Sequence, residues 1–425
     1  MIAATRQHQQ ETALRLWQHA AIFLFVCAAI ILRRPDGVFH AQFFAEDGHV
    51  WYAEAYNFGW WSALFRTYVG YFVVLPRLAA SIALLVPLSL VPLTLNLIAI
   101  PIQALPVNLL LSSRSSAWGS LRFRALLAGA YLLLPNCYEL LLGITDANWL
   151  LVLSAFILLV GSVPQGVAAK LLDISVLLLT GLTGPFSLFL FPISVFLAWK
   201  NRNRWRWVQA GILVFTLLIQ VRALLTGAAV SRPHFALGAT PALFTRMVGS
   251  QIFLGTLLGS NQISLIPGEG FFVFLLCATA VGATLMVVCF SSSSLEMKLF
   301  LLFSGMVLGA SLIAPTVQPP PGASVWEVLA ATSGIRYWFF PGLAFAWTLI
   351  SCCRSRSSLL KYTSAALLFL MCIGIIRDWR LTPLPDEHLP QYVRLFESAP
   401  AGVTVTIPLY PGGWTMKLVK HPPSR

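Results

Sequence analysis

The sequence predicts an all-α membrane protein, a polytopic bundle of roughly 11–13 transmembrane helices. Of its 425 residues, 58% are hydrophobic and only 10% are charged, whereas a soluble domain has about 25% charged residues. Uncharged stretches such as 271–290 provide the roughly 20 apolar residues that one crossing requires. These stretches are expected to be helices, because backbone groups within lipid must be hydrogen-bonded internally.

The apolar stretches occur along most of the chain. We place membrane-spanning helices at 15–32, 125–142, 147–163, 171–184, 186–199, 208–226, 270–290, 298–315, 336–353 and 359–376. The segment 71–111 is also apolar, but five prolines interrupt it: Pro76, Pro87, Pro92, Pro101 and Pro106. It is long enough for two helices, or for three short ones.

Arginines in the loops predict the orientation. The loops 112–124, 200–207 and 354–358 carry arginines, which are typical of cytoplasmic loops. The remaining segments, 33–70, 143–146, 227–269, 316–335 and 377–425, then lie outside. This assignment requires an odd number of crossings within 71–111. It also leaves Arg33 and Arg34 outside, whereas the preference of arginine for cytoplasmic loops (the positive-inside rule) would place them inside.

Three parts follow from this topology. Residues 1–14 form a cytoplasmic N-terminus, and residues 15–376 form the transmembrane domain, whose first outer loop, 33–70, carries interfacial helices. Residues 377–425 form a small α/β-like tail, in which 403–407 alternate like a strand. We expect the tail to lie against the outer face, and the protein to be a multi-pass protein of the inner (plasma) membrane.

Several classes of function are excluded or disfavoured. The net charge of +13 could indicate nucleic-acid binding, but the basic residues lie in short runs between apolar segments rather than on one face of a soluble domain. The seven cysteines have no metal-site or disulfide spacing. No glycine-rich nucleotide-binding motif is present, which disfavours an ATP-driven pump.

Acidic residues outside the tail concentrate on the predicted outer side. Eight of the fifteen acidic residues map there: Asp36, Glu46, Asp47, Glu54, Glu139, Asp146, Glu269 and Glu327. Charged groups at the membrane are costly, so they often mark functional sites. Any catalytic carboxylate is therefore expected to face outward.

Glu46 and Asp47 form the densest acidic pair, and aromatic residues flank them on both sides. Adjacent carboxylates repel each other, which raises one pKa and suits a general base or a metal ligand. The aromatic residues favour the membrane interface and predict an amphipathic helix lying on the bilayer. Two alternatives stay open: Asp47 as a helix N-cap, and Mg²⁺ or Mn²⁺ bound by the pair.

Two further clusters lie in outer segments. Arg77 follows Pro76 closely after the loop, and Arg336 begins a span from outside; a guanidinium there could snorkel to the interface or bind a lipid phosphate with two hydrogen bonds. The turn 143–149 contains Asp146, which could also cap the following helix.

Four short motifs carry a resemblance: Phe44-Ala45-Glu46-Asp47-Gly48, Gly70-Tyr71 with Pro76-Arg77, Asn148-Trp149, and Gly334-Ile335-Arg336-Tyr337. Together with the plan of one span, an acidic outer loop and many further spans, they resemble the GT-C class of membrane glycosyltransferases. The plan is similar to that of protein O-mannosyltransferases and aminoarabinose transferases. The chain departs from the class in having Glu46-Asp47 instead of Asp-x-Asp, and in lacking a large soluble C-terminal domain.

The resemblance implies a polyprenyl-phosphate sugar donor, and a glycan, lipid or protein acceptor on the outer face. Asp47 or Glu46 would be the general base. Arg77, Arg336 and Arg66 would hold the donor phosphate. We expect the substrate to contact the remaining motif residues: His49, Tyr71, Asp146, Asn148, Trp149 and Tyr337.

Two other functions stay open. A transporter or flippase of lipid-linked saccharides would place polar groups near the midplane and often shows repeated halves; few charges lie deep in the predicted spans, and no repeat is visible. A polysaccharide polymerase or ligase would concentrate functional residues in a long outer loop between late spans. Here the acidic pair lies in the first loop instead.

Overall fold

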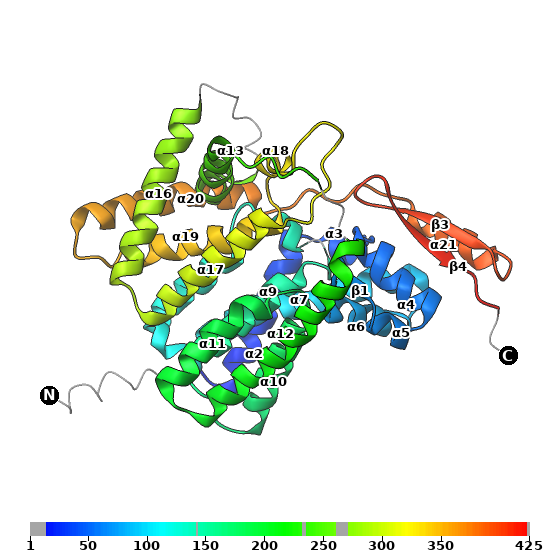
Figure 1. The fold of residues 1–425 in the computed structure, drawn as a ribbon, viewed down its shortest axis with the longest axis horizontal. Coiled ribbons are helices and arrows are strands. Elements are labelled where there is room, and N and C mark those ends of the chain that lie inside the picture. Colours follow the sequence, from blue (N-terminus) through cyan, green and yellow to red (C-terminus); the bar gives the residue numbers. More distant parts are fainter. Residues whose placement is uncertain (1–13, 142, 232–234, 261–270, 423–425) are drawn as a thin grey trace.

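The computed structural model describes residues 14–141, 143–231, 235–260 and 271–422, and it is predominantly helical (Figure 1). The α-helices are α2 (Leu16–Arg33), α3 (Asp36–Phe39), α4 (Ala53–Phe58), α5 (Trp60–Leu64), α6 (Val74–Ala83), α7 (Val91–Leu111), α8 (Leu121–Leu132), α9 (Ala147–Val160), α10 (Val167–Gly181), α11 (Ser187–Asn201), α12 (Arg204–Ser231), α13 (Pro241–Arg246), α14 (Gly255–Leu258), α16 (Phe272–Ser292), α17 (Leu295–Ile313), α18 (Val325–Ala331), α19 (Phe339–Cys352), α20 (Ser358–Asp378) and α21 (Leu389–Ser398).

Short 3-10 and π-helices connect them. These are η2 (Asp47–Tyr52), η3 (Leu88–Leu90), η4 (Ser113–Trp118), η5 (Tyr138–Leu141), η6 (Met247–Leu254) and η8 (Arg336–Trp338). Strands within the described residues form two antiparallel hairpins, β1 (Thr67–Tyr68) with β2 (Tyr71–Phe72), and β3 (Thr404–Leu409) with β4 (Trp414–Val419). The all-α prediction with a small α/β-like tail agrees with this architecture.

Six helices among the described residues are long and apolar enough to cross a membrane. They are α2, α7 with η3, α12, α16, α17 and α20. The shorter helices α9 and α19 are almost entirely buried and form the centre of the bundle. These features support the prediction of a membrane protein with several spans.

Two predicted elements need correction. The helix predicted at 125–142 ends at Leu132, because Pro135 disfavours helical geometry at Leu134 and Asn136 has a positive φ of 55°. The chain resumes in η5. The segment 227–269, predicted as a loop, contains a nearly continuous helix from Pro241 to Leu258, in which the residues of η6 are buried.

The proline-rich segment 71–111 contains α6 and α7. α6 has ten residues and is about 15 Å long, roughly half the hydrocarbon thickness. Pro92 lies in the first turn of α7, where a proline costs no hydrogen bond. α6 is therefore too short to cross the membrane, and α7 is the single long helix of this segment.

The connecting segments gather at two ends of the bundle. At one end, which we call the arginine end, Arg114 binds both carboxylate oxygens of Asp173 at 2.7 and 3.0 Å. Trp205 and Gln209 donate to the same carboxylate, at 3.2 and 3.0 Å. Arg354 stacks on Phe123 in the same region. The loops with predicted cytoplasmic arginines thus contact one another.

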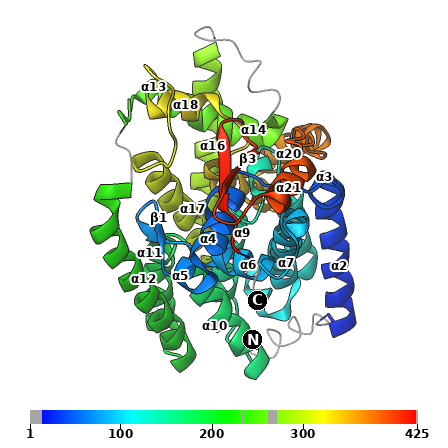
Figure 2. The same cartoon turned by 90° about the vertical axis from the view of Figure 1, so that its right-hand side faces the viewer.

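The other end, which we call the hairpin end, carries the tail and the segment 36–72. The amide of Ala45 donates to the carbonyl of Tyr410 at 2.7 Å. Asn57 exchanges hydrogen bonds with Lys417 and Val419, so β4 runs along α4. Figure 2 shows the β3 strand in front of α4 and α9. The tail therefore packs directly on the first loop.

The first loop, 33–70, contains α3, η2, α4 and α5. Phe58, Trp60, Trp61 and Phe65 expose more than half of their surface. Aromatic residues exposed in this way are typical of a membrane interface. The same loop buries Trp51 and Asp47 on its other face, so it presents aromatic rings outward and polar groups inward.

Candidate functional site

Four segments that are distant in the sequence bring charged side chains together at the hairpin end. They are residues 46–54, 66–77, 139–146 and 336–337. The resulting charged cluster contains five carboxylates and three guanidinium groups: Glu46, Asp47, Glu54, Glu139, Asp146, Arg66, Arg77 and Arg336. Because the carboxylates outnumber the cations, mutual repulsion favours protonation of the most buried acids.

Asp47 is one of three buried charged residues of the cluster, with Arg77 and Asp146. Its side chain is 3% exposed. One carboxylate oxygen accepts from the hydroxyl of Thr145 at 2.6 Å and from the Thr145 amide at 3.1 Å; the other accepts from the Ile144 amide at 3.3 Å. Burial raises the pKa of Asp47 to about 7, against the opposing effect of these hydrogen bonds. The carboxylate is therefore fixed in position and titrates near neutrality.

Two local features permit this arrangement. A side chain at Gly143 would lie 2.1 Å from Oδ2 of Asp47, so only glycine allows the turn to approach so closely. Ala45 has a positive φ of 42°, and its amide hydrogen bond to Tyr410 helps hold it there. Asp47 is the first residue of η2 but bonds to the turn 144–145, so it does not cap its own helix.

Glu46 points to a different neighbour. Tyr68 donates its hydroxyl to Oε1 of Glu46 at 3.3 Å, and burial raises the pKa of Tyr68 above its usual value. The Tyr68 ring meets Trp51 edge to face, with centroids 5.1 Å apart. Trp51 in turn donates its indole N–H to Thr145 at 2.8 Å. The two adjacent acids are thus separated and held by different partners.

Glu54 lies between two arginines. Its Oε2 is 2.6 Å from Nη1 of Arg77 and 3.3 Å from Nε of Arg66. Arg77 is 0% exposed, and its guanidinium lies 5.1 Å from the centroid of the Trp51 ring. Arg66 is 45% exposed. Of these two predicted phosphate ligands, only Arg66 is open to a ligand in this conformation, and Arg77 holds Glu54 in place.

Arg336 joins the turn 139–146 to the start of α19. It binds Glu139 at 2.7 Å and Asp146 at 3.4 Å, and its Nη2 donates to Thr316 at 3.3 Å. Burial lowers the pKa of Arg336, but the two carboxylates outweigh this effect and raise it well above its usual value. Burial raises the pKa of Asp146, with Arg336 opposing and Glu139 adding to the shift. Asp146 occupies the N-cap position of α9 but forms no capping hydrogen bond.

The other predicted substrate-binding residues lie around this cluster. Tyr71 pairs with Tyr68 in the first hairpin. The ring of Trp149 lies edge to face with Phe186 and Tyr337, and the Tyr337 hydroxyl bonds to Thr316 at 2.8 Å. The carbonyl oxygen of the Asn148 side chain is buried and has no partner among the described residues. Trp149 and Tyr337 are buried, and Tyr71 and Asn148 are half-buried, so only the latter two present surface to a ligand.

His49 contacts the tail instead of the cluster. Its imidazole bonds to the Thr415 carbonyl and meets the Trp414 ring edge to face, 5.2 Å between centroids. This residue therefore joins the first loop to β4. Its predicted contact with a substrate would require a ligand located at the junction with the tail.

The fit of a divalent cation can be judged from the donors. Both oxygens of Asp47 already accept hydrogen bonds, and Glu46 bonds to Tyr68. Nowhere in the described ranges do three histidine, cysteine or acidic side chains approach closely enough to share an ion. The pair therefore does not form a cation site in this conformation.

Several residues of the site were missed from the sequence. Thr145 donates hydrogen bonds to Asp47, Glu139 accepts hydrogen bonds from Arg336, and Glu54 pairs with Arg66 and Arg77. Thr145 directly precedes Asp146 in the turn 143–149, so its position in the sequence indicates that it lies near the site. The Glu139–Arg336 pair spans 197 residues, and no local pattern indicates it.

A comparison of the chain with models of known protein families finds no match, and a comparison with curated protein sequences finds no similar protein. The interpretation of the site therefore depends on its geometry and chemistry.

Proposed function

We propose that this protein is a membrane glycosyltransferase of the GT-C plan. It would transfer a sugar from a polyprenyl-phosphate donor to an acceptor at the hairpin end, which we place on the outer face of an inner (plasma) membrane. One observation carries the proposal: three hydrogen bonds hold Asp47 in the cluster that also contains the guanidinium groups of Arg66 and Arg336, and burial raises its pKa to about 7. A general base is most effective when its pKa lies near the working pH.

The proposed chemistry uses three parts of the charged cluster. The Asp47 carboxylate takes the proton from the acceptor hydroxyl as the hydroxyl attacks the anomeric carbon of the donor. The bond from that carbon to the phosphate oxygen breaks, and the polyprenyl phosphate leaves with the electron pair. Arg66 and Arg336 hold the phosphate and stabilise the charge that develops on it. Positioning of both substrates supplies much of the remaining rate.

The arrangement of charges favours this function over transport. A transporter places ionisable groups near the midplane between repeated halves. Here the buried charges belong to the contacts at the two ends of the bundle, with Asp47, Asp146 and Arg77 at the hairpin end and Asp173 at the arginine end. The described helices thus concentrate buried charge at the two ends of the bundle, which supports a site at a membrane face.

The direct test is a transfer assay with the full-length protein in liposomes. A polyprenyl-phosphate sugar carrying a radiolabel is expected to lose its sugar to acceptor or water in a time-dependent reaction. The same sugar supplied as a nucleoside diphosphate sugar is expected to stay intact, because the sequence has no glycine-rich nucleotide-binding motif. Turnover of the nucleotide sugar, or of neither donor across common sugars, would contradict the proposal.

The proposal includes eleven crossings, by the six long helices together with α8, α9, α10, α11 and α19. This number places the arginine end inside and the tail outside.

Cysteine labelling tests this topology. Cysteines that replace the exposed residues Asp386 and Arg202 are expected to differ in their accessibility to a membrane-impermeant maleimide. Position 386 should label in intact cells, and position 202 only after permeabilisation. The unmodified chain gives the background from its own cysteines, and labelling at 202 in intact cells would reverse the topology.

Transfer is expected to increase with pH and to reach half of its maximum near pH 7, because only the deprotonated carboxylate of Asp47 accepts the proton. One unit below the midpoint, roughly one tenth of the activity remains. Thr145→Val should move the midpoint to higher pH, because the hydroxyl hydrogen bond that stabilises the carboxylate is lost. Thr145→Ser, which keeps the hydroxyl, serves as the matched control. A flat profile, or an unchanged midpoint in Thr145→Val, would argue against Asp47 as the base.

A further inference from the structure

Two adjacent arginines at the end of α2 have different surroundings. Arg33 donates to the carbonyls of Leu132, Leu134, Asp378 and Trp379, so its guanidinium is fully used in holding the chain together. Arg34 is 5% exposed. It donates to one carbonyl, that of Leu141 at 2.7 Å.

The rest of the Arg34 guanidinium lacks acceptors. Its Nε lies 3.6 Å from Asp36, beyond hydrogen-bond distance, and neither Nε nor Nη2 has an acceptor within the part of the chain that the structure describes. An unsatisfied buried donor is costly, and the cost is larger for a charged group. Such a group is expected to be completed by a ligand.

Arg34 lines a cavity between α2 and α7 of about 290 Å³, a volume that includes space open to solvent. Its polar lining consists of Arg34, Asn96 and Gln103, and Ile30, Ile100 and Val38 are among its apolar residues. The Oε1 atom of Gln103 has no donor among the described residues. The cavity therefore combines an apolar wall with a guanidinium that is ion-paired with Asp36 at 3.6 Å but has two donor nitrogens without acceptors. It lies on the side where α2 forms the edge of the bundle (Figure 2).

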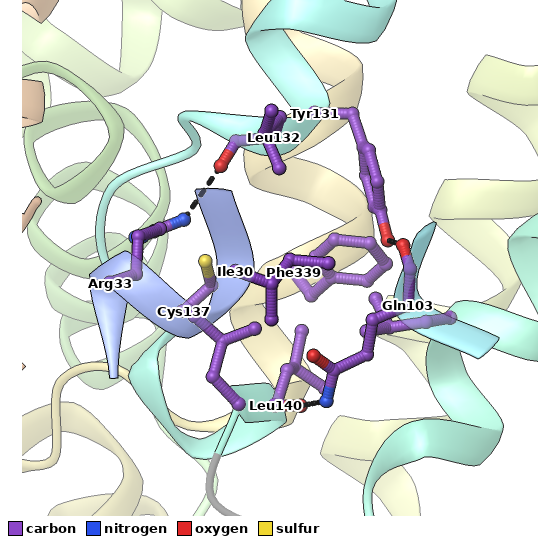
Figure 3. Close-up of a pocket in the computed structure, with 10 residues that line it drawn as sticks. Ile30, Arg33, Gln103, Tyr131, Leu132, Cys137, Leu140 and Phe339 are labelled. Carbon is purple, nitrogen blue, oxygen red and sulfur yellow. Dashed lines mark hydrogen bonds between the residues drawn. The ribbon is translucent and has the colours of Figure 1, made fainter. Parts of the chain in front are cut away.

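A second cavity adjoins the first. Its volume of about 350 Å³ also includes space open to solvent, and it shares Ile30, Gln103 and Leu141 with its neighbour. Figure 3 shows Ile30, Leu140 and Phe339 around this space, while Arg33 bonds away from it to the Leu132 carbonyl. The second cavity is mainly apolar and would suit the first carbons of a chain.

The first cavity also reaches the candidate base. Gly143 is part of its lining, and a side chain on Gly143 would meet Asp47 at 2.1 Å. The Asp47 carboxylate thus lies directly behind this part of the wall. A phosphate bound to Arg34 would be separated from Asp47 by the thickness of one glycine.

We infer that the cavity between α2 and α7 binds the phosphate of a membrane lipid at Arg34 and that the first carbons of its isoprenoid chain extend past Ile30 and Phe339. The assignment of this lipid as the sugar donor depends on the proposed function, whereas the binding of a lipid phosphate does not. Arg34 thereby becomes a phosphate ligand in addition to Arg66 and Arg336, and the donor approaches from the side of α2.

Binding of a polyprenyl monophosphate to the purified full-length protein, measured by native mass spectrometry, tests the inference. Phosphatidylglycerol and inorganic phosphate are the comparison probes. Arg34→Gln is expected to weaken binding of the polyprenyl monophosphate roughly 10- to 100-fold, as expected for loss of charged hydrogen bonds. Ala99→Leu narrows the same cavity without changing charge and is expected to weaken it as well. Arg356→Gln, an exposed arginine at the opposite end, should bind as the wild type does.

Unchanged affinity in both Arg34→Gln and Ala99→Leu would overturn the inference. Equal affinity of the wild type for phosphatidylglycerol or inorganic phosphate would overturn the isoprenoid assignment. If Arg34→Gln lost transfer but kept its affinity, the lipid site would be wrong while the proposed function stood. If binding depended on Arg34 but the wild type transferred no sugar, the lipid site would stand and the function would be wrong.

Discussion

Replacement of Asp47 by asparagine is expected to lower the rate of sugar transfer by roughly 10²–10⁴-fold, the usual contribution of a positioned general base. The asparagine amide cannot accept the proton of an acceptor hydroxyl. It would also turn an N–H group toward the amide of Ile144 or of Thr145, both of which donate to this side chain. The assay is transfer from a polyprenyl-phosphate sugar at saturating donor.

Glu46→Gln is the matched control for this variant. It removes an equal charge from the adjacent position, but the Tyr68 hydroxyl can still donate to the amide oxygen. We expect a decrease of less than about tenfold, because this acid is outside the proton-transfer step. Full activity in Asp47→Asn, or equal losses in the two variants, would show that Asp47 is not the base.

Arg114→Met is expected to destabilise the protein by roughly 3–5 kcal/mol, the usual cost of leaving one member of a buried ion pair without its partner. Asp173 is fully buried, and Arg114 provides two of its hydrogen bonds. The measurement is thermal or denaturant unfolding of the purified protein in detergent.

The double variant Arg114→Met with Asp173→Leu should recover much of this loss, because an apolar pair has no unpaired charge to desolvate. Arg122→Met, an exposed arginine at the same end, controls for the loss of positive charge. A double variant no more stable than Arg114→Met alone would show that Arg114 and Asp173 do not stabilise the protein as an ion pair.

Long apolar helices were predictable from the sequence because hydropathy acts locally. The bounds of α2, α16, α17 and α20 agree with the predicted spans to within a few residues. The break after α8 was not predicted, although Pro135 marks it, because the apolar composition continues across the proline. The helix 241–258 was also not predicted, since it contains polar residues such as Gln251, whose side-chain amide donates to the carbonyl of Ala330.

The composition of the candidate site was predictable in part. The acidic pair and Arg336 follow from the cost of charge at a membrane, and the structure places them in one cluster. Their partners depend on tertiary packing: Asp47 meets Thr145, and Arg336 meets Glu139, across 98 and 197 residues. Arg33 and Arg34, which contradict the positive-inside rule, are buried. The rule concerns exposed loop charge, so it does not apply to them.

The contact between the first loop and the tail has a consequence for biosynthesis. His49 bonds to Thr415, 366 residues further along the chain, and Ala45 bonds to Tyr410. A polypeptide inserted from its N-terminus delivers the loop to the membrane long before β3 and β4 exist. The loop that carries Asp47 therefore reaches its final shape only after residues 404–419 have been synthesised and have packed against it.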